Sequence, residues 1–288
     1  GPATALQTFR NCLDGEEVIR KSRKEYDQAI SRSLLVTPHA VINRGLQWAK
    51  VNTLRVQHSY RSGKAFTNDP PQDIVVVRDV GWYVLGSDYV TPGFSHDVLQ
   101  FCERHAFHED GKLTEYVHAN EEKPALHDYG LNINDDTPLF VLARYRHALL
   151  CEQDSWEKVY PPIKRACDYI LSQVSDGLVW CQTTGTGVYG ICSWRNIIEG
   201  YNLSGAVTEI NAECFHALSL AAEVAGHLGK SGEAQRFGSA AKALRDAINS
   251  KLVSERTGLY LLALGNDGIR HHDVTGDLVF PLLFDLRE

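Results

Sequence analysis

Carboxyl, amide, guanidinium and aromatic side chains occur together in four stretches of this sequence. Flat aromatic rings stack on the apolar faces of sugar rings, while carboxylates, amides and arginine bind hydroxyl groups. Cleavage of a glycosidic bond also needs two carboxyl groups, one on each side of the bond. The pattern therefore predicts a carbohydrate site formed by Arg78, Asp79, Trp82, Asp135, Asp136, Trp194, Arg195, Asn196, Glu199, Glu209 and Asn211.

Two of these residues, Glu199 and Glu209, are the predicted catalytic carboxyls, and the other nine are predicted to bind substrate. Glu209 and Asn211 lie at the start of a predicted helix that is apolar on nearly all sides, so it offers their side chains almost no polar surroundings. Burying both side chains without partners would be costly, so their presence favours a functional site.

Each of these residues also has a structural interpretation. An Asp at a helix start, such as Asp135 or Asp136, is commonly a cap, and Glu209 could simply favour the positive end of a helix dipole. Arg78 and Asp79 could form an ion pair, and a lone Trp is often a core residue. The recurrence of the same mixture at four junctions between a loop and a helix favours the site.

Helical periodicity dominates the elements that must position these residues. Residues 156–174 and 234–248 carry single apolar stripes at spacings of three and four, which predict helices covered on one side. Residues 209–225 are apolar nearly all round, which predicts a fully buried helix. Further helices are expected over 16–33, 37–55, 95–107 and 136–150, and short strands over 73–78 and 258–263.

Local signals add detail to these helices. Thr37 and Pro38 are typical of an N-cap followed by the first helical residue, and Asp154 with Glu157 resembles a capping box. The helices succeed one another in pairs, one fully apolar and one with a single stripe. This alternation predicts an all-α fold with two concentric rings, and long loops over 111–134 and 175–204 are expected to be functional.

Composition excludes several classes of function. The 288 residues carry a formal net charge of −7, which disfavours nucleic acid and anionic membranes as partners. No apolar run approaches the roughly 20 residues that span a bilayer. The seven cysteines form no Cys-x-x-Cys pair, so we expect thiols in a reducing cytoplasm and no structural zinc. No metal site is expected, because His271 and His272 are adjacent and their side chains diverge. No cofactor is expected, because the sequence has no nucleotide-binding loop.

The order of the motifs resembles the glucosidase domain of glycogen-debranching enzymes (amylo-α-1,6-glucosidases) and, more broadly, the (α/α)6-barrel glycoside hydrolases. The resemblance covers about residue 73 to the end of the chain. It implies a single α/α-toroid domain over residues 1–288, a site where the inner helices begin, and inverting hydrolysis of an α-glucoside or small oligosaccharide. It rests on Arg78-Asp79, Asp110-Gly111, Asn132 to Phe140, Asp176-Gly177, Ser193 to Asn196 and Val207 to Ala212.

Two features depart from that family. Asn196 occupies the position of the family's acidic residue, and an amide cannot act as a general acid, so Glu199 is expected to replace it. Twelve helices also need on the order of 350 residues. We therefore expect an incomplete barrel after a tag remnant at residues 1–2, completed by a C-terminal segment that carries the second carboxylate or by a second copy.

Three other functions fit the same residues. The Asn at position 196 is compatible with a carbohydrate-binding protein that has lost catalysis, or with a fragment of an enzyme. A helical toroid could also serve as a scaffold, in which case no acidic, aromatic-lined cavity would exist. A glycoside phosphorylase would need a phosphate site, for which the sequence offers no motif.

Overall fold

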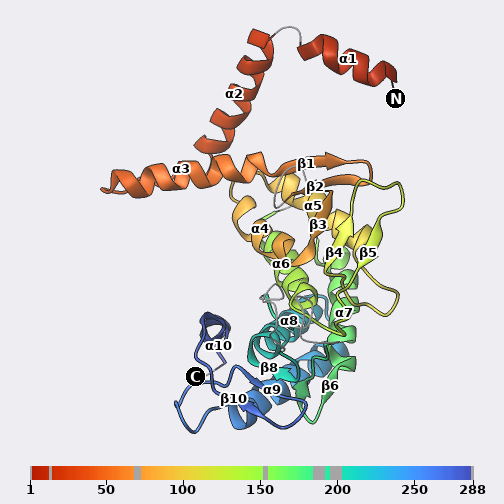
Figure 1. The fold of residues 1–288 in the computed structure, drawn as a ribbon, viewed down its shortest axis with the longest axis vertical. Coiled ribbons are helices and arrows are strands. Elements are labelled where there is room, and N and C mark those ends of the chain that lie inside the picture. The colour runs from red at the N-terminus through yellow and green to blue at the C-terminus, as the bar shows by residue number, and fades with distance from the viewer. Residues whose placement is uncertain are drawn as a thin grey trace.

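A computed structural model describes residues 2–12, 15–67, 73–151, 155–183, 192–194 and 203–286. Helices that pair into hairpins dominate its C-terminal two thirds (Figure 1). Their bounds are α4 (Val77–Ser87), α5 (Pro92–His105), α6 (Asp136–Leu150), α7 (Trp156–Ser172), α8 (Thr208–His227) and α9 (Ser231–Lys251).

These helices form two layers. The inner helices α4, α6 and α8 pack against one another in that order, and α5, α7 and α9 cover them from outside. Helices α6 and α8 are buried nearly all round, whereas α7 buries a stripe that includes Val159, Ile163 and Ile170. The predicted arrangement of inner and outer helices is confirmed, as three hairpins in the described part of the chain.

A fourth position in the inner layer of helices, after α4, α6 and α8, begins near the C-terminal end of the described residues. The 3-10 helix η1 (Gly276–Val279) leads into α10 (Phe280–Leu283), and both pack against α8. Asp277 in η1 lies close enough to Glu209 in the first turn of α8 to raise its pKa, so the start of η1 is near the start of α8.

Short antiparallel strands lie around the ends at which the inner helices begin. Strand β3 leads directly into α4, and β8 leads directly into α8. One sheet has the order β3-β4-β5 and another the order β10-β9-β8. The strands are β1 (Gln57–Tyr60), β2 (Gly63–Phe66), β3 (Ile74–Val76), β4 (Tyr116–His118), β5 (Ala125–His127), β6 (Val174–Ser175), β7 (Leu178–Val179), β8 (Ala206–Val207), β9 (Ala263–Leu264) and β10 (Arg270–His271).

First-turn side chains of two inner helices bind backbone groups outside their own helix. Asp136 Oδ1 accepts a 2.8 Å hydrogen bond from the backbone N–H of Arg78 at the start of α4. This bond gives a partner to an N–H group that a helix start leaves unpaired, and it links the starts of α4 and α6. Thr208 Oγ1 donates to the carbonyl of Leu261 at 2.6 Å, which links the start of α8 to the segment after α9.

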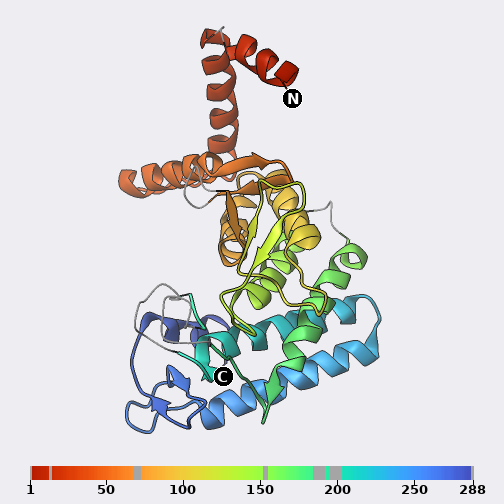
Figure 2. The same cartoon turned by 45° about the vertical axis from the view of Figure 1, so that its right-hand side comes forward.

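Three N-terminal helices extend away from the hairpins as an arm: α1 (Pro2–Cys12), α2 (Gly15–Ser31) and α3 (Ala40–Arg55) (Figures 1 and 2). Most of their described side chains are exposed. Lys50 on α3 ties the arm together, because its Nζ donates to the carbonyl of Ile30 at 2.9 Å and also to that of Arg32. That the whole chain forms one domain stays a prediction.

Several local predictions were wrong. Helix α3 begins at Ala40 with His39 as N-cap, because Thr37 instead binds the side chain of Asn43 through its backbone N–H at 2.9 Å. Helix α7 has Ser155 as its N-cap, and Asp154 lies outside the described residues. The strand expected over 258–263 is shorter and begins at Ala263.

In the part of the chain that the structure describes, no helix combines the length and apolar character needed to cross a membrane. The structure shows thiols at Cys102, Cys151, Cys167, Cys181, Cys192 and Cys214.

Candidate active site

A pocket of about 460 Å³ opens where the inner helices begin. Residues of β3, the first turns of α4, the β4–β5 hairpin and the loop around residue 193 contribute to it. Its lining residues are Val76, Arg78, Asp79, Trp82, Glu115, Tyr116, Tyr129 and Trp194.

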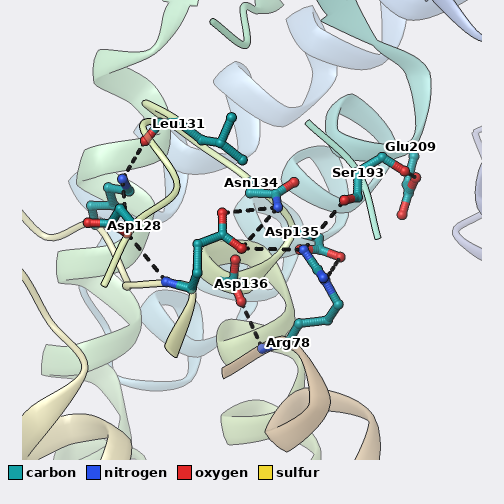
Figure 3. Close-up of polar contacts among 10 residues, drawn as sticks. Arg78, Asp128, Leu131, Asn134, Asp135, Asp136, Ser193 and Glu209 are labelled. Atoms are coloured by element: carbon teal, nitrogen blue, oxygen red, sulfur yellow. Dashed lines mark hydrogen bonds and ion pairs between the residues drawn. The ribbon is translucent and has the colours of Figure 1, made fainter. Parts of the chain in front are cut away.

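Arg78 is a buried cation that lines this pocket and lies at the centre of a polar network. Figure 3 shows its contacts. Its Nε lies 2.5 Å from Asp135 Oδ2, and its Nη2 lies 3.4 Å from Glu115 Oε2. The same Nη2 lies 3.5 Å from the carbonyl of Ser193. One guanidinium thus joins three segments that are far apart in sequence, since a planar donor group can serve several acceptors at once.

Glu115 and Asp136 form a second part of the network. Asn134 Nδ2 donates to both oxygens of Glu115, at 3.1 and 3.3 Å. Burial raises the pKa of both carboxyls. The pKa of Asp136 lies well above its ordinary value, because the nearby charges of Glu115 and Asp135 add to the effect of burial. Burial and the two nearby carboxyls therefore favour the neutral form of Asp136 over its charged form.

Glu209 is buried in the first turn of α8, behind Ser193. Ser193 Oγ donates to Glu209 Oε2 at 2.7 Å, while Oε1 accepts no hydrogen bond from the described residues. Burial and the nearby charges of Asp135 and Asp277 raise the pKa of Glu209 to about 8. This carboxyl is consequently protonated at neutral pH, which is the state that a general acid requires.

Glu213 lies one turn further along α8, on the same face as Glu209. It is buried, and neither of its carboxyl oxygens has a hydrogen-bond partner among the described residues. Burial and the proximity of Glu209 raise the pKa of Glu213 well above its ordinary value. Burial behind the pocket therefore disfavours the charged forms of Glu209 and Glu213.

Aromatic rings flank the acids on two sides. The indoles of Trp82 and Trp194 are 38% and 50% exposed, so both are accessible to a ligand in the pocket. On the other side, Tyr116 stacks on His127 with ring centroids 4.6 Å apart, and Tyr129 lies 5.5 Å from Tyr116. Such surfaces suit the apolar faces of sugar rings.

The structure brings together most of the predicted site residues that it describes. Arg78, Asp79, Trp82 and Trp194 line the pocket, and Asp135, Asp136 and Glu209 are buried in the network around it. The ion-pair partners of Arg78 are Asp135 and Glu115 rather than the adjacent Asp79 that the sequence suggested as an alternative. Arg195, Asn196 and Glu199 lie outside the described residues.

Asn211 has a structural role instead of a pocket position. Its side chain is fully buried and accepts from the N–H of Val179 at 2.8 Å. Its Nδ2 donates to the carbonyls of Val179 and Val207, each at 2.9 Å. The expected cost of burying this amide is thus met by backbone partners, and it fastens β7 to α8.

Sequence reasoning missed three acids of this site: Glu115, Glu213 and Asp277. Asp277 Oδ1 accepts a 2.5 Å hydrogen bond from the indole Nε1 of Trp194. Glu213 carried a detectable signal, since it lies four residues after Glu209 in an apolar helix. Glu115 and Asp277 carried no such signal, because only the fold brings their segments to the pocket.

The described acids around Arg78 do not form a group of three ligands close enough to share a metal ion. The arrangement that they do form is a buried network of carboxyls beside exposed aromatic rings. Carboxyls whose pKa is raised can act as general acids.

Comparison with known proteins identifies the type of fold. Residues 149–288 match the bacterial α-L-rhamnosidase six-hairpin glycosidase domain. No curated protein sequence matches the chain. Together with the solved structures below, this result confirms the predicted (α/α)6 glycoside hydrolase fold.

Three solved structures illustrate the likeness. A family 78 rhamnosidase of Bacillus sp. GL1 aligns with a TM-score of 0.57 and 18% identity over 88% of this chain and 25% of its own. A rhamnosidase from Klebsiella oxytoca with bound rhamnose gives 0.58 and 16%, over 78% and 41%. A family 63 mannosylglycerate hydrolase from Thermus thermophilus in complex with glucose gives 0.62 and 11%, over 83% and 71%. The chain thus spans only a quarter of the length of the first of these enzymes.

Proposed function

We propose that this chain, which has the (α/α)6 glycoside hydrolase fold, binds a sugar in the pocket at the inner-helix starts and contributes to hydrolysis of its glycosidic bond. The observation that carries this proposal is the position of two exposed indoles beside a buried carboxyl network, in the pocket around Arg78. A purely structural network would not need accessible aromatic rings beside it.

In the bound state, Trp82 and Trp194 stack against the apolar faces of the sugar. Asp79, which lines the pocket, accepts hydrogen bonds from hydroxyl groups. Arg78 keeps Asp135 and Glu115 in place, so that their orientation does not depend on the ligand. Supporting hydrogen bonds of this kind hold the groups of a binding site in a productive geometry.

Among the described residues, Glu209 is the acid that we propose. Ser193 donates to Oε2, which leaves the proton on Oε1. Transfer of that proton to the leaving oxygen would break the glycosidic bond, while a second carboxyl activates water on the opposite face. A separation of roughly 6.5–9.5 Å between the two carboxyls would give inversion. Glu199 remains the other proposed acid.

The sugar itself is a finer proposal. The resemblance to debranching enzymes favours an α-glucoside or small oligosaccharide, whereas the matched domain carries the name of α-L-rhamnosidases. Both sugars are neutral pyranoses with apolar faces, and both are compatible with a pocket of two indoles and hydroxyl-binding groups. We propose that the substrate is an α-glucoside. Turnover of α-glucosides and of α-L-rhamnosides, compared in one assay, would distinguish the two sugars.

A carbohydrate-binding protein without turnover is the second candidate. The observation in its favour is Asn196, which cannot donate a proton in place of the family's acid. Such a protein would keep the indoles and the hydroxyl-binding groups but would not need a protonated Glu209.

The test combines turnover with calorimetric binding. Nitrophenyl α-glucosides, nitrophenyl α-L-rhamnosides and small oligosaccharides are offered to the wild type and to Glu209→Gln. Turnover by the wild type that is lost in Glu209→Gln, with sugar binding retained, supports hydrolysis with Glu209 as acid. Binding without turnover by the wild type, unchanged in Asn196→Asp, supports the binding protein. Absence of both binding and turnover contradicts both proposals.

A further inference from the structure

A second cluster of chemically reactive side chains lies at the opposite end of the inner helices from the pocket. Asp88 is the C-cap of α4, His147 lies in the last turn of α6, and Cys151 is the C-cap of α6. Helix α6 has 15 residues, so it separates this cluster from the pocket by about 22 Å. None of the three residues takes part in the proposed hydrolysis.

The cluster is compact. His147 Nδ1 lies 2.7 Å from Asp88 Oδ1. One carboxylate oxygen of Asp88, one ring nitrogen of His147 and Sγ of Cys151 all lie within 4.8 Å of one another. In tetrahedral zinc coordination, the ligand atoms are about 3.3–3.8 Å apart. Shifts of about 1 Å would therefore bring these atoms to the distances that zinc requires.

Burial sets this cluster apart from an ordinary surface group of acids. His147 is fully buried, Asp88 is 7% exposed, and Cys151 is half-buried. Although Asp88 Oδ1 is bonded to the His147 ring, the buried Oδ2 accepts no hydrogen bond from the described residues. A buried carboxylate oxygen without a donor is costly, and a cation would remove that cost.

The backbone around the cluster also favours a cation. Two helices, α4 and α6, end at this point, and each helix C-terminus carries a partial negative charge from its unpaired carbonyls. Both C-caps are themselves members of the cluster. The field of the backbone and the charge of Asp88 therefore act in the same direction.

The types of ligand atom in the cluster favour zinc over calcium and magnesium. Calcium and magnesium prefer sites made of oxygen atoms, whereas a set of thiolate, imidazole and carboxylate suits zinc. His147 and Cys151 lie four residues apart on α6, and ligands at that spacing lie on one face of a helix.

We propose that Asp88, His147 and Cys151 bind one Zn²⁺ ion, with a water molecule as the fourth ligand. Binding converts the Cys151 thiol to a thiolate, and its proton passes to solvent. The ion joins the C-terminal ends of the neighbouring inner helices α4 and α6 and stabilises the barrel at the end away from the pocket. Its role is structural, and it does not depend on the proposed hydrolysis.

The experiment uses the full chain, freed of metal, and titrates it with Zn²⁺ and with Co²⁺ as a spectroscopic probe. We expect one equivalent of metal and a thiolate-to-cobalt charge-transfer band. Cys151→Ser should abolish that band, and both Cys151→Ser and Asp88→Asn should weaken Zn²⁺ binding by about tenfold or more. Cys102→Ser, which removes a buried thiol on α5 outside the cluster, is the matched control and should bind as the wild type does.

A second measurement needs no variant. Alkylation of Cys151 in the wild type, located by mass spectrometry, should slow strongly when one equivalent of Zn²⁺ is present. Equal alkylation with and without Zn²⁺ would overturn the proposal. A charge-transfer band that persists in Cys151→Ser, or Zn²⁺ affinity unchanged in that variant, would place the metal elsewhere and overturn it as well.

Discussion

The indole Nε1 of Trp194 donates to Asp277 Oδ1 at 2.5 Å, although the two residues are 83 positions apart. Asp277 is almost fully buried at the start of η1, where it also accepts from Thr275 Oγ1 at 3.2 Å. The loop that carries Trp194 is thus attached to the beginning of the fourth inner position. This contact orients one of the two indoles that line the pocket.

Replacement of Trp194 by Ala should weaken sugar binding by roughly 1–3 kcal/mol, by analogy with the stacking of bases on aromatic side chains. The indole is half exposed, so the free energy of unfolding should change much less. Calorimetry with the bound sugar and chemical denaturation measure the two effects. Trp194→Phe keeps a ring but loses the donor to Asp277, and it should have an intermediate affinity. Wild-type affinity in Trp194→Ala would remove this residue from the site.

Replacement of Arg78 by Met should lower the free energy of unfolding by roughly 3–5 kcal/mol, because buried carboxyls lose their cation. Arg78 lowers the pKa of Glu115 against the effect of burial, so the loss of stability should shrink as pH falls and Glu115 takes up a proton. Urea unfolding at several pH values measures the difference. Arg61→Met is the control, since its ion pair with Glu122 is exposed and such pairs contribute about 1 kcal/mol or less. A cost independent of pH would contradict this account.

The raised pKa of Glu209 predicts a pH-dependent stability. Between its unfolded value of 4.5 and about 8, the folded chain keeps a proton that the unfolded chain releases. The contribution of this group is therefore complete below pH 4.5 and is lost as pH rises towards 8, with a slope of at most about 1.4 kcal/mol per pH unit. Glu209→Gln has no such proton.

Unfolding measurements from pH 4.5 to 8 should therefore show Glu209→Gln gaining stability relative to the wild type as pH rises. Glu121→Gln, at an exposed position, should show no comparable change. If the difference between Glu209→Gln and the wild type stays constant across this range, Glu209 does not carry the proton.

Two glycines of α4 give a prediction about packing. A Cβ atom at Gly81 would lie 2.9 Å from Leu139 Cβ on α6, whereas one at Gly86 would meet nothing within 4 Å. Gly81→Ala should therefore destabilise the chain by roughly 1–3 kcal/mol through overpacking. Gly86→Ala should stabilise it by roughly 0.5–1 kcal/mol, because alanine is the better helix former. Thermal unfolding of both variants measures the contrast, and equal effects would mean that α4 and α6 do not approach closely at Gly81.

Local sequence predicted most of the helices and the two layers, but it missed α4, whose first two residues were assigned to a strand over 73–78. Val159, Ile163 and Ile170 predicted the buried stripe of α7, because side chains three, four or seven positions apart share one face of a helix. The start of α6 at Asp136 was predicted to the residue. The start of α3 was not, because the side chain of Asn43 competes for Thr37.

The sequence also determined which kinds of side chain gather at the helix starts, including Arg78, Trp82 and Trp194. Only the tertiary structure decided how they pair. Adjacent residues on a helix point in different directions, so Arg78 binds Asp135, 57 positions away, rather than Asp79. The same holds for Asp88 and His147, whose 2.7 Å contact joins two helices. Periodicity is a property of the local chain, whereas the partner of a buried charge depends on which helices pack together.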